Sequence, residues 1–130
     1  MITEDYVSFE IAKLLKEKGF DGYCFAFHKE QDKYESHPNS VHFAPTLINN
    51  EYLLDTSIII CPTLQMTMKW LRENHNIKVN IFYNNSNYTI EYFEPNTQTG
   101  VGKFVFIGDG YPSYEQACES AIKYCLENLI

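Results

Sequence analysis

No part of this 130-residue sequence carries an excess of positive charge. Ten Lys and Arg side chains stand against seventeen Asp and Glu, which gives a net charge of −7. The first 61 residues contain five basic and ten acidic side chains, and the remainder contain five and seven. Because nucleic-acid binders draw most of their affinity from neutralising phosphates, this balance disfavours generic binding to nucleic acid or to an anionic membrane.

Long apolar runs are also missing. The longest uninterrupted apolar run spans only a few residues, whereas a membrane-spanning helix needs about 20. The chain opens with MITEDYVSFE, which has early acidic residues and no basic-then-apolar leader. We therefore expect a cytoplasmic protein that does not span a membrane.

The cysteines lack the spacings of metal or redox motifs. The chain has four, at Cys24, Cys61, Cys118 and Cys125, and none forms a Cys-x-x-Cys pair. Cys118 and Cys125 lie seven residues apart on one face of a predicted helix, which is too far for a disulfide. No cysteine stands in a recognisable nucleophile context, so the sequence predicts free, reduced and buried thiols.

Signatures of catalysis and ligand binding are absent as well. The histidines, His28, His37, His42 and His75, have no metal-ligating partner at helical spacing. His37 and His42 flank PNSV in a predicted loop, where we favour ordinary surface histidines over the alternative of a weak divalent-metal site. The stretch TGVGKF resembles part of a phosphate-binding loop. Phe104 nevertheless stands where that loop needs Ser or Thr, and a strand follows instead of a helix. We predict no catalytic residue, no cofactor and no metal site.

Apolar and aromatic residues are abundant. Apolar residues make up 45% of the chain and aromatic residues 15%, including ten Tyr and nine Phe. Residues of this kind are spread along the whole length, and 130 residues is the size of one domain. We predict a single domain over residues 1–130, with residues 21–61 as a variable or inserted segment.

Three helices are predicted from capping residues and apolar spacing. The first covers residues 8–18, with Ser8 as its N-cap and Gly19 beyond its end. The second covers residues 64–74 after Thr63 as its N-cap. The third begins at Ser113, which forms a capping box with Gln116. Its inward stripe consists of Cys118, Ile122, Cys125 and Leu129.

The strands are predicted from apolar alternation. Residues 77–83, 88–93 and 103–107 form three consecutive strands in the second half. GYCFAF and the end of EYLLDTSIII predict strands in the first half. KYESHPNSVHF at 33–43 is interpreted as a second strand or an irregular loop, and APTL at 44–47 as a turn. The order is α-β(β)-α-β-β-β-α, which predicts an α+β fold with three main helices on an antiparallel sheet.

The third of these later strands is apolar on both sides. A strand with one wet face alternates apolar and polar residues, so residues 104–107 predict cover on both faces, by the N-terminal half or by a second subunit. Phe82 and Phe93 lie on the sheet face opposite Ile90. We single them out as a candidate interaction surface, with a second core layer as an equally good interpretation.

The second half has the order of a double-stranded-RNA-binding domain, which is α-β-β-β-α. In that domain the last helix begins with lysines that contact phosphates. Here Glu115 and Glu119 occupy the corresponding turn, and Lys123 lies well beyond it. The topology therefore matches while nucleic-acid binding is disfavoured.

Three segments resemble a known family: VSFEIAKLLKEKGF (7–20), PTLQMTMKWLRENHNI (62–77) and PSYEQACESAIKYCLENLI (112–130). They resemble, in the same order, the recurrent segments of small proteins encoded in Bacteroides and related gut bacteria, often in prophages and mobile elements. The second half is also similar in order to the phage ABA sandwich domain. Neither family has an assigned activity, so the resemblance implies an origin and no reaction.

Three hypotheses follow. The first is a non-enzymatic protein-interaction module of phage or mobile-element origin, acting on a protein partner or as a homodimer. The second is a nucleic-acid-associated regulatory protein with double-stranded-RNA-binding-like topology. The third is a small ligand-binding protein or hydrolase, with residues of the 21–61 segment around a pocket.

Overall fold

A computed structural model describes residues 2–29, 41–53 and 57–130 of the chain. It contains three α-helices and two antiparallel three-stranded sheets, which confirms the predicted α+β class. By its internal packing the chain divides into two compact units, Met1–Met66 and Thr67–Ile130. The prediction of one domain over residues 1–130 remains a prediction.

The first helix of the Met1–Met66 unit, α1 (Phe9–Glu17), ends where its capping residues predict. Ser8 is the N-cap, and its side-chain oxygen accepts a hydrogen bond from the Ile11 backbone at 3.3 Å. At the other end Gly19 has a φ of 84°, the left-handed conformation that glycine adopts without a Cβ clash. Local sequence alone therefore accounts for both termini of α1.

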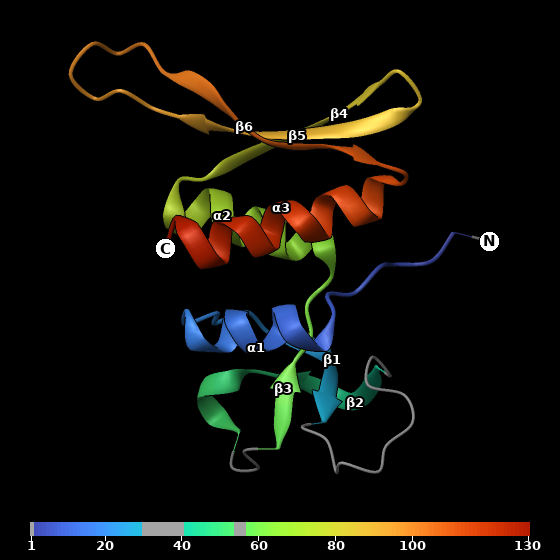
Figure 1. Cartoon of the computed structure of the whole chain (residues 1–130). Coiled ribbons are helices and arrows are strands. Elements are labelled where there is room, and N and C mark those ends of the chain that lie inside the picture. The colour runs from blue at the N-terminus through green and yellow to red at the C-terminus, as the bar shows by residue number, and fades with distance from the viewer. Residues whose placement is uncertain (1, 30–40, 54–56) are drawn as a thin grey trace. The chain divides into compact units, whose positions relative to one another are not determined.

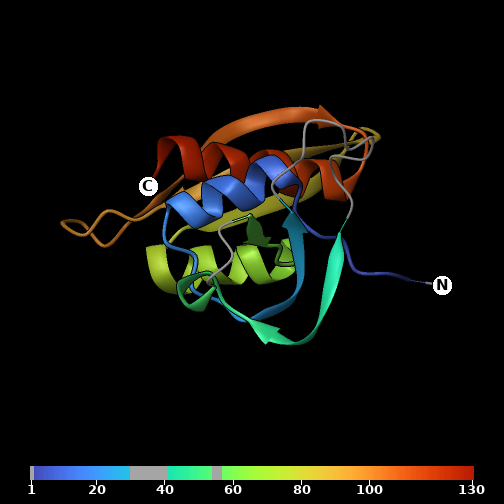
Figure 2. The same ribbon diagram turned by 90° about the horizontal axis from the view of Figure 1, so that it is seen from below.

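The sheet of this unit consists of β1 (Cys24–Lys29), β2 (His42–Ile48) and β3 (Ile58–Ile60), in the order β2-β1-β3. Both pairings are antiparallel, and β1 and β2 can be followed side by side in Figure 2. A short 3₁₀ helix, Asn50–Tyr52, follows β2. The helix α1 contacts β3, and in Figure 1 it runs across the direction of β1 and β3.

The interpretation of residues 44–47 as a turn was wrong, because these residues belong to β2. Pro45 is tolerated there because β2 is an edge strand, where a missing N–H removes no bond that the sheet needs. The pairing with β1 is also irregular, with a shift of register between Cys24 and Ala26. The other strand or loop predicted near this point, over residues 33–43, falls mostly outside the described residues.

The helix α2 (Leu64–His75) starts at the predicted cap, since the Thr63 hydroxyl accepts a hydrogen bond from the Met66 N–H at 3.1 Å. Its first residues belong to the Met1–Met66 unit and the rest to Thr67–Ile130. The last turn is followed by Asn76 at a φ of 52°, a left-handed position that Asn adopts more readily than most residues. Met68, Trp70 and Leu71 of this helix are buried.

The Thr67–Ile130 unit contains a continuous meander of β4 (Lys78–Asn84), β5 (Asn87–Glu94) and β6 (Lys103–Tyr111). Every residue of β4 pairs with β5, from Lys78 opposite Phe93 to Asn84 opposite Asn87. The strand order confirms the α-β-β-β-α sequence of elements predicted for the second half.

The last helix, α3 (Tyr114–Asn128), covers one face of this sheet, as Figure 1 shows. Ser113 is its N-cap, accepting a hydrogen bond from the Gln116 N–H at 3.1 Å and donating to the Gln116 side-chain oxygen at 3.2 Å. Ile90 lies at the centre of the packing against Ala117 and Ala121, all three with no exposed surface. Cys118, Ile122 and Cys125 of the predicted stripe are fully buried, and Leu129 forms the C-cap.

The predicted cover on both faces of the third strand of the meander is not observed among the described residues. Val105 and Ile107 are partly buried, but Phe104 and Phe106 remain 58% and 61% exposed. One face of β6 is therefore apolar and open to solvent.

Candidate functional site

A hollow of about 280 Å³ lies in the Met1–Met66 unit, beyond the point where β3 ends. β3 pairs with β1 only from Phe27 to Lys29, so the start of β1 faces the chain segment that leads into α2. The lining is almost entirely apolar and consists of Tyr6, Tyr23, Cys24, Phe25, Ala26, Leu47, Cys61, Pro62, Thr63 and Met66. Most of these residues come from the 21–61 segment, where the third hypothesis places a pocket.

Two sulfur atoms meet in this lining. The Cys24 thiol donates to the Met66 Sδ at 3.6 Å, and Cys24 is 5% exposed. Burial raises the pKa of the Cys24 thiol to about 11, because a thiolate is poorly solvated away from water. At neutral pH Cys24 is therefore a protonated thiol and a weak nucleophile.

A second thiol in the lining lies beside a histidine. The Cys61 Sγ lies 3.1 Å from the His28 Nε2. The Cys61 thiol donates to the Val7 carbonyl oxygen at 3.2 Å, and the His28 Nε2 lies 3.0 Å from the same oxygen, which can only accept. Cys61 follows β3, His28 is on β1, and Val7 precedes α1. Residues from three segments thus place a thiol, an imidazole and a carbonyl oxygen within hydrogen-bonding distance of one another.

The imidazole of His28 is enclosed, with only 1% of the residue exposed. The Phe9 ring meets it edge-on, with centroids 5.9 Å apart. Within the described part of the chain, the Nδ1 atom of His28 has no hydrogen-bond partner. An unpaired buried nitrogen costs free energy, which makes this histidine unusual among side chains that serve packing alone.

The candidate residues Phe82 and Phe93 lie on the outer face of the β4-β5-β6 sheet, opposite the side that packs on α3. Strand alternation and the register place them there together with Phe104 and Phe106. Phe93 contacts Phe104 edge-on, with ring centroids 5.4 Å apart. We call these four side chains the phenylalanine face.

The phenylalanine face is exposed and uncharged overall. Phe82 is 37% exposed, and Phe104 and Phe106 are more than half exposed. Among the paired residues on this side of the three strands, all of which the structure describes, only Lys78 and Glu91 carry charge. Glu91 accepts a hydrogen bond from the Asn80 side chain at 2.9 Å. The paired residues on this side of the sheet therefore carry one charge of each sign, in a chain whose net charge is −7.

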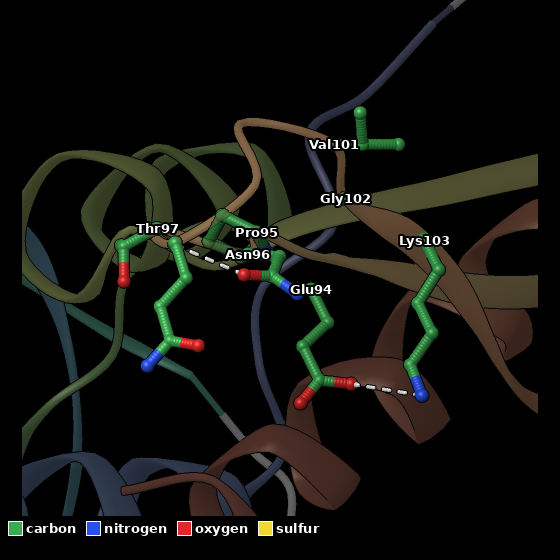
Figure 3. A pocket seen from close by; sticks show the side chains of 8 residues that line it. Glu94, Pro95, Asn96, Thr97, Val101, Gly102 and Lys103 are labelled. Carbon is green, nitrogen blue, oxygen red and sulfur yellow. Dashed lines mark hydrogen bonds and ion pairs between the residues drawn. The ribbon is translucent and has the colours of Figure 1, made fainter.

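A larger hollow of about 550 Å³ lies within the hairpin loop between β5 and β6, shown in Figure 3. It is formed by the curl of one loop, in which the Asn96 side chain accepts hydrogen bonds from the backbone of Gln98 and Thr99. Glu94 and Lys103 form an ion pair at 3.9 Å across its base. Its residues are nearly all exposed and bring together no nucleophile or base, so the geometry there is that of a turn.

The same loop contains the sequence that resembles a phosphate-binding motif. Gly102 lies in the loop, and Lys103 begins β6. No helix starts there whose N-terminus would bind a phosphate, which agrees with the interpretation as a hairpin loop.

Aromatic neighbours account for two of the other histidines. His42 stacks on Phe27 at 5.4 Å, and His75 meets Trp70 edge-on at 4.6 Å. His37 lies outside the described residues. Within the described ranges, His, Cys, Asp and Glu side chains do not gather in any group of three that would hold a metal ion.

Sequence reasoning missed the pair of Cys61 and His28. The two residues are 33 positions apart, and their approach depends on the register of β1 and β3, in which Phe27 pairs with Ile60. The available signal was the position of each residue at the end of an apolar strand-like run. The conclusion that no cysteine has a nucleophile context stays a prediction, because the Cys61 thiol donates to the Val7 carbonyl oxygen and the His28 Nε2 lies against the same oxygen.

Comparison of the chain with protein-family models, with curated proteins and with solved structures found no match. The resemblance to gut-bacterial and prophage proteins therefore stays a prediction. Among the described helices, none combines the length and the apolar character that crossing a membrane would require.

Proposed function

We propose that this chain is a non-enzymatic protein-interaction module whose docking surface is the phenylalanine face, and that the partner is a second copy of the chain. The observation that carries the proposal is the exposure of Phe104 and Phe106, 58% and 61%, beside Phe82 and Phe93 on one side of a regular sheet. Large aromatic side chains that gather on an open surface are typical of interfaces.

The phenylalanine face is the surface on which net charge least opposes a second copy as the partner. Two chains of net charge −7 repel each other over most of their surface, whereas the phenylalanine face adds no net charge of its own. Lys78 and Glu91 lie on the same side of the sheet, so a two-fold axis through that side would place opposite charges in reach of each other. Two such sheets would pack face to face about 10 Å apart.

The size of this face predicts a weak dimer. Three strands spaced about 4.8 Å apart and about 23 Å long present roughly 330 Å² in projection. Stable interfaces bury about 800 Å² on each partner. We therefore expect a concentration-dependent dimer with a dissociation constant in the micromolar range.

The test is sedimentation equilibrium of the wild-type chain and of Phe106→Lys over a concentration series up to about 100 µM. The wild-type chain is expected to move from monomer to dimer, and Phe106→Lys to weaken association by at least about tenfold, because it buries a charge in an apolar interface.

Val101→Lys is the matched control, because Val101 is also apolar and 73% exposed but lies in the hairpin loop, outside the phenylalanine face. This variant is expected to associate as the wild type does. A wild-type chain that stays monomeric throughout the series, or equal weakening by both substitutions, would contradict the proposal.

A further inference from the structure

We propose that the free edge of β4 pairs with the β4 edge of a second copy, antiparallel and centred on Ile81, which joins two β4-β5-β6 sheets into one continuous sheet. β4 lies at the edge of its sheet, beside β5 in the order β4-β5-β6 (Figure 1). The N–H and C=O groups of an edge strand that point away from its neighbour can form a second ladder of hydrogen bonds. This contact is separate from the phenylalanine face.

Three of the four sheet edges among the described residues have features that hinder pairing with another chain. β2 contains Pro45 and pairs with β1 through a shift of register, and β3 has only three residues. β6 pairs with β5 through two shifts of register, and it contains Gly108 and Gly110. Short strands, prolines and bulges are the usual means by which proteins keep sheet edges from pairing.

β4 has none of these features. All seven of its residues pair with β5 without a shift of register, and it contains neither proline nor glycine. Its one charged residue is Lys78, at its first position. Every residue of β4 is partly or fully exposed, including Tyr83 at 65%. β4 is therefore a regular edge, uncharged over most of its length, and edges of this kind pair readily with another strand.

The sequence of β4 is complementary to itself. An antiparallel pair centred on Ile81 uses the whole strand, from its first residue to its last. The opposed residues are Lys78 with Asn84, Val79 with Tyr83, Asn80 with Phe82, and Ile81 with its own copy. No opposed pair brings together two charges of like sign, which would destabilise the pairing. A second copy therefore fits this edge along its full length.

The inner side of the strand gains packing from the pairing. Val79 and Ile81 pack against the cluster around Ile90, and alternation places Tyr83 on the same side. In the joined sheet the Tyr83 ring lies beside Val79 of the second copy, as a cross-strand pair of an aromatic and a β-branched side chain. The contact thus covers part of a large ring that the single chain exposes to solvent.

The edge contact is smaller than the phenylalanine face. A strand of this length is about 23 Å long and a sheet is about 10 Å thick, which gives roughly 230 Å² per copy. The phenylalanine face presents roughly 330 Å², and stable interfaces bury about 800 Å² on each partner. We therefore expect edge pairs to be a minor species at micromolar concentrations, which a covalent trap detects.

Pairing at the edge enlarges the phenylalanine face. The two-fold axis is perpendicular to the sheet, so the outer sides of both copies stay on one side of the joined sheet. The two faces then form one surface of roughly 660 Å², closer to the area of a stable interface. This consequence depends on the function proposed above, whereas the edge pairing itself does not.

The test uses a disulfide to trap the pair. The full chain carrying Ile81→Cys is oxidised at about 200 µM, and the linked dimer is measured by non-reducing electrophoresis. Directly opposed residues of an antiparallel pair have Cβ atoms about 4.5 to 5.5 Å apart, close to the separation that a disulfide needs. The native cysteines are buried, so the substituted position is expected to react first.

Ile107→Cys is the matched control. Ile107 is also partly buried, packs against the cluster around Ile90 and lies in the other edge strand of the sheet. Ile81→Cys is expected to give at least about tenfold more linked dimer than Ile107→Cys. Equal amounts from the two variants would overturn the proposal.

A second pair of variants tests the register, and it replaces Ile81→Cys if circular dichroism shows that this variant does not fold. Val79→Cys and Tyr83→Cys are oxidised separately and as a mixture. The proposed register opposes residue 79 of one copy to residue 83 of the other, so the mixture is expected to give at least about fivefold more linked dimer than either variant alone. An equal yield in all three samples would overturn the proposed pairing.

A charge on the strand tests the contact by repulsion. Asn80→Lys, added to Ile81→Cys, places two lysines on diagonal neighbours about 7 to 8 Å apart. It is expected to lower the yield of linked dimer about fivefold in low salt, and about 1 M NaCl should restore the yield by screening the charges. A yield that does not fall in low salt would contradict the edge contact.

Phe106→Lys, added to Ile81→Cys, separates this contact from the phenylalanine face. Phe106 lies on β6, away from the β4 edge, so the yield of linked dimer is expected to change less than about twofold. Loss of the linked dimer in this variant would show that the copies meet only through the phenylalanine face, and would overturn the edge contact. Specific linking at residue 81 in a chain whose phenylalanine face does not associate would leave the edge contact standing and contradict the proposed function.

Discussion

The two units of this chain contain similar sheets but differ in which side chains they bury and which they expose. Each has three antiparallel strands with a helix along one face. The Met1–Met66 unit encloses polar chemistry, since His28 and Cys61 are both buried. The Thr67–Ile130 unit has an apolar inner face around Ile90 and exposes large aromatic rings on its outer face. Burial therefore encloses a hydrogen-bonded His28 and Cys61 in one unit and a mainly apolar packing around Ile90 in the other.

The difference follows from strand length and pairing. In the Thr67–Ile130 unit β4 is paired along its whole length, so alternation separates inner from outer residues cleanly. In the Met1–Met66 unit β3 has only three residues. β3 does not extend as far as the start of β1, so a hollow lies beside the first residues of β1 where a paired strand would otherwise lie.

The largest expected change in the free energy of unfolding comes from comparing substitutions on the two faces of the β4-β5-β6 sheet. Ile90→Ala should lower the free energy of unfolding by about 4 kcal/mol, because Ile90 has no exposed surface and its loss leaves a cavity. Phe106→Ala on the outer face should cost less than about 1 kcal/mol in the monomer. Urea unfolding at low protein concentration measures both, and similar values would mean that the outer ring is buried in solution.

The second prediction contrasts two buried thiols, one in each unit. Burial raises the pKa of Cys24 to about 11 and that of Cys125 to about 12, from 9.0 in the unfolded chain. The stabilisation is fully present below pH 9 and is lost as pH rises, since the unfolded thiol ionises first. Each thiol should therefore cost about 2 to 3 kcal/mol of stability by pH 11.

The measurement compares the stability of Cys24→Ala, Cys125→Ala and the wild type by urea unfolding at pH 8 and pH 11. Each variant should lose less stability between the two pH values than the wild type, and this difference cancels the titration of the ten tyrosines. An identical loss in the wild type and a variant would show that its thiol ionises equally in the folded and unfolded chains.

The smallest expected change in the free energy of unfolding concerns the helix N-caps, one in each unit. Ser8→Ala and Ser113→Ala each remove a hydroxyl that accepts a backbone N–H, at 3.3 Å and 3.1 Å. Each should destabilise the chain by about 1 kcal/mol. Ser8→Asp and Ser113→Asp should retain the wild-type stability, because a carboxylate also caps a helix start. If the Asp variants lose as much as the Ala variants, capping is not the role of these serines.

Prediction from sequence succeeded where the cause is local. Ser8, Thr63 and Ser113 were predicted as caps, and each accepts the expected backbone hydrogen bond. Alternation along residues 77–93 placed Phe82 and Phe93 on the side opposite Ile90, and the register agrees. These features depend on residues a few positions apart, so propensity and period are sufficient to predict them.

The predictions that failed depend on how strands pair and on what covers the faces of a sheet. Residues 44–47 were interpreted as a turn because Pro45 suits a chain that leaves an extended segment and no helical period follows it. Only the edge position of β2 makes Pro45 acceptable within a strand. The double apolar pattern around Phe104 and Phe106 predicted cover on both sides of β6, but that cover is missing among the described residues. An apolar pattern indicates which side chains would gain free energy from burial. It does not indicate whether another part of the chain, or a partner, is there to bury them.

By itself the sequence determined the α+β class, the ends of the helices, the alternation of the second sheet and the acidic character of the chain. Only the tertiary structure decided that His28 lies 3.1 Å from the Cys61 sulfur and that Cys61 is among the residues lining a hollow. The physical reason is distance along the chain. Helix-capping residues and apolar periodicity depend on residues only a few positions apart. The approach of two side chains 33 residues apart depends instead on which strands pair and in which register.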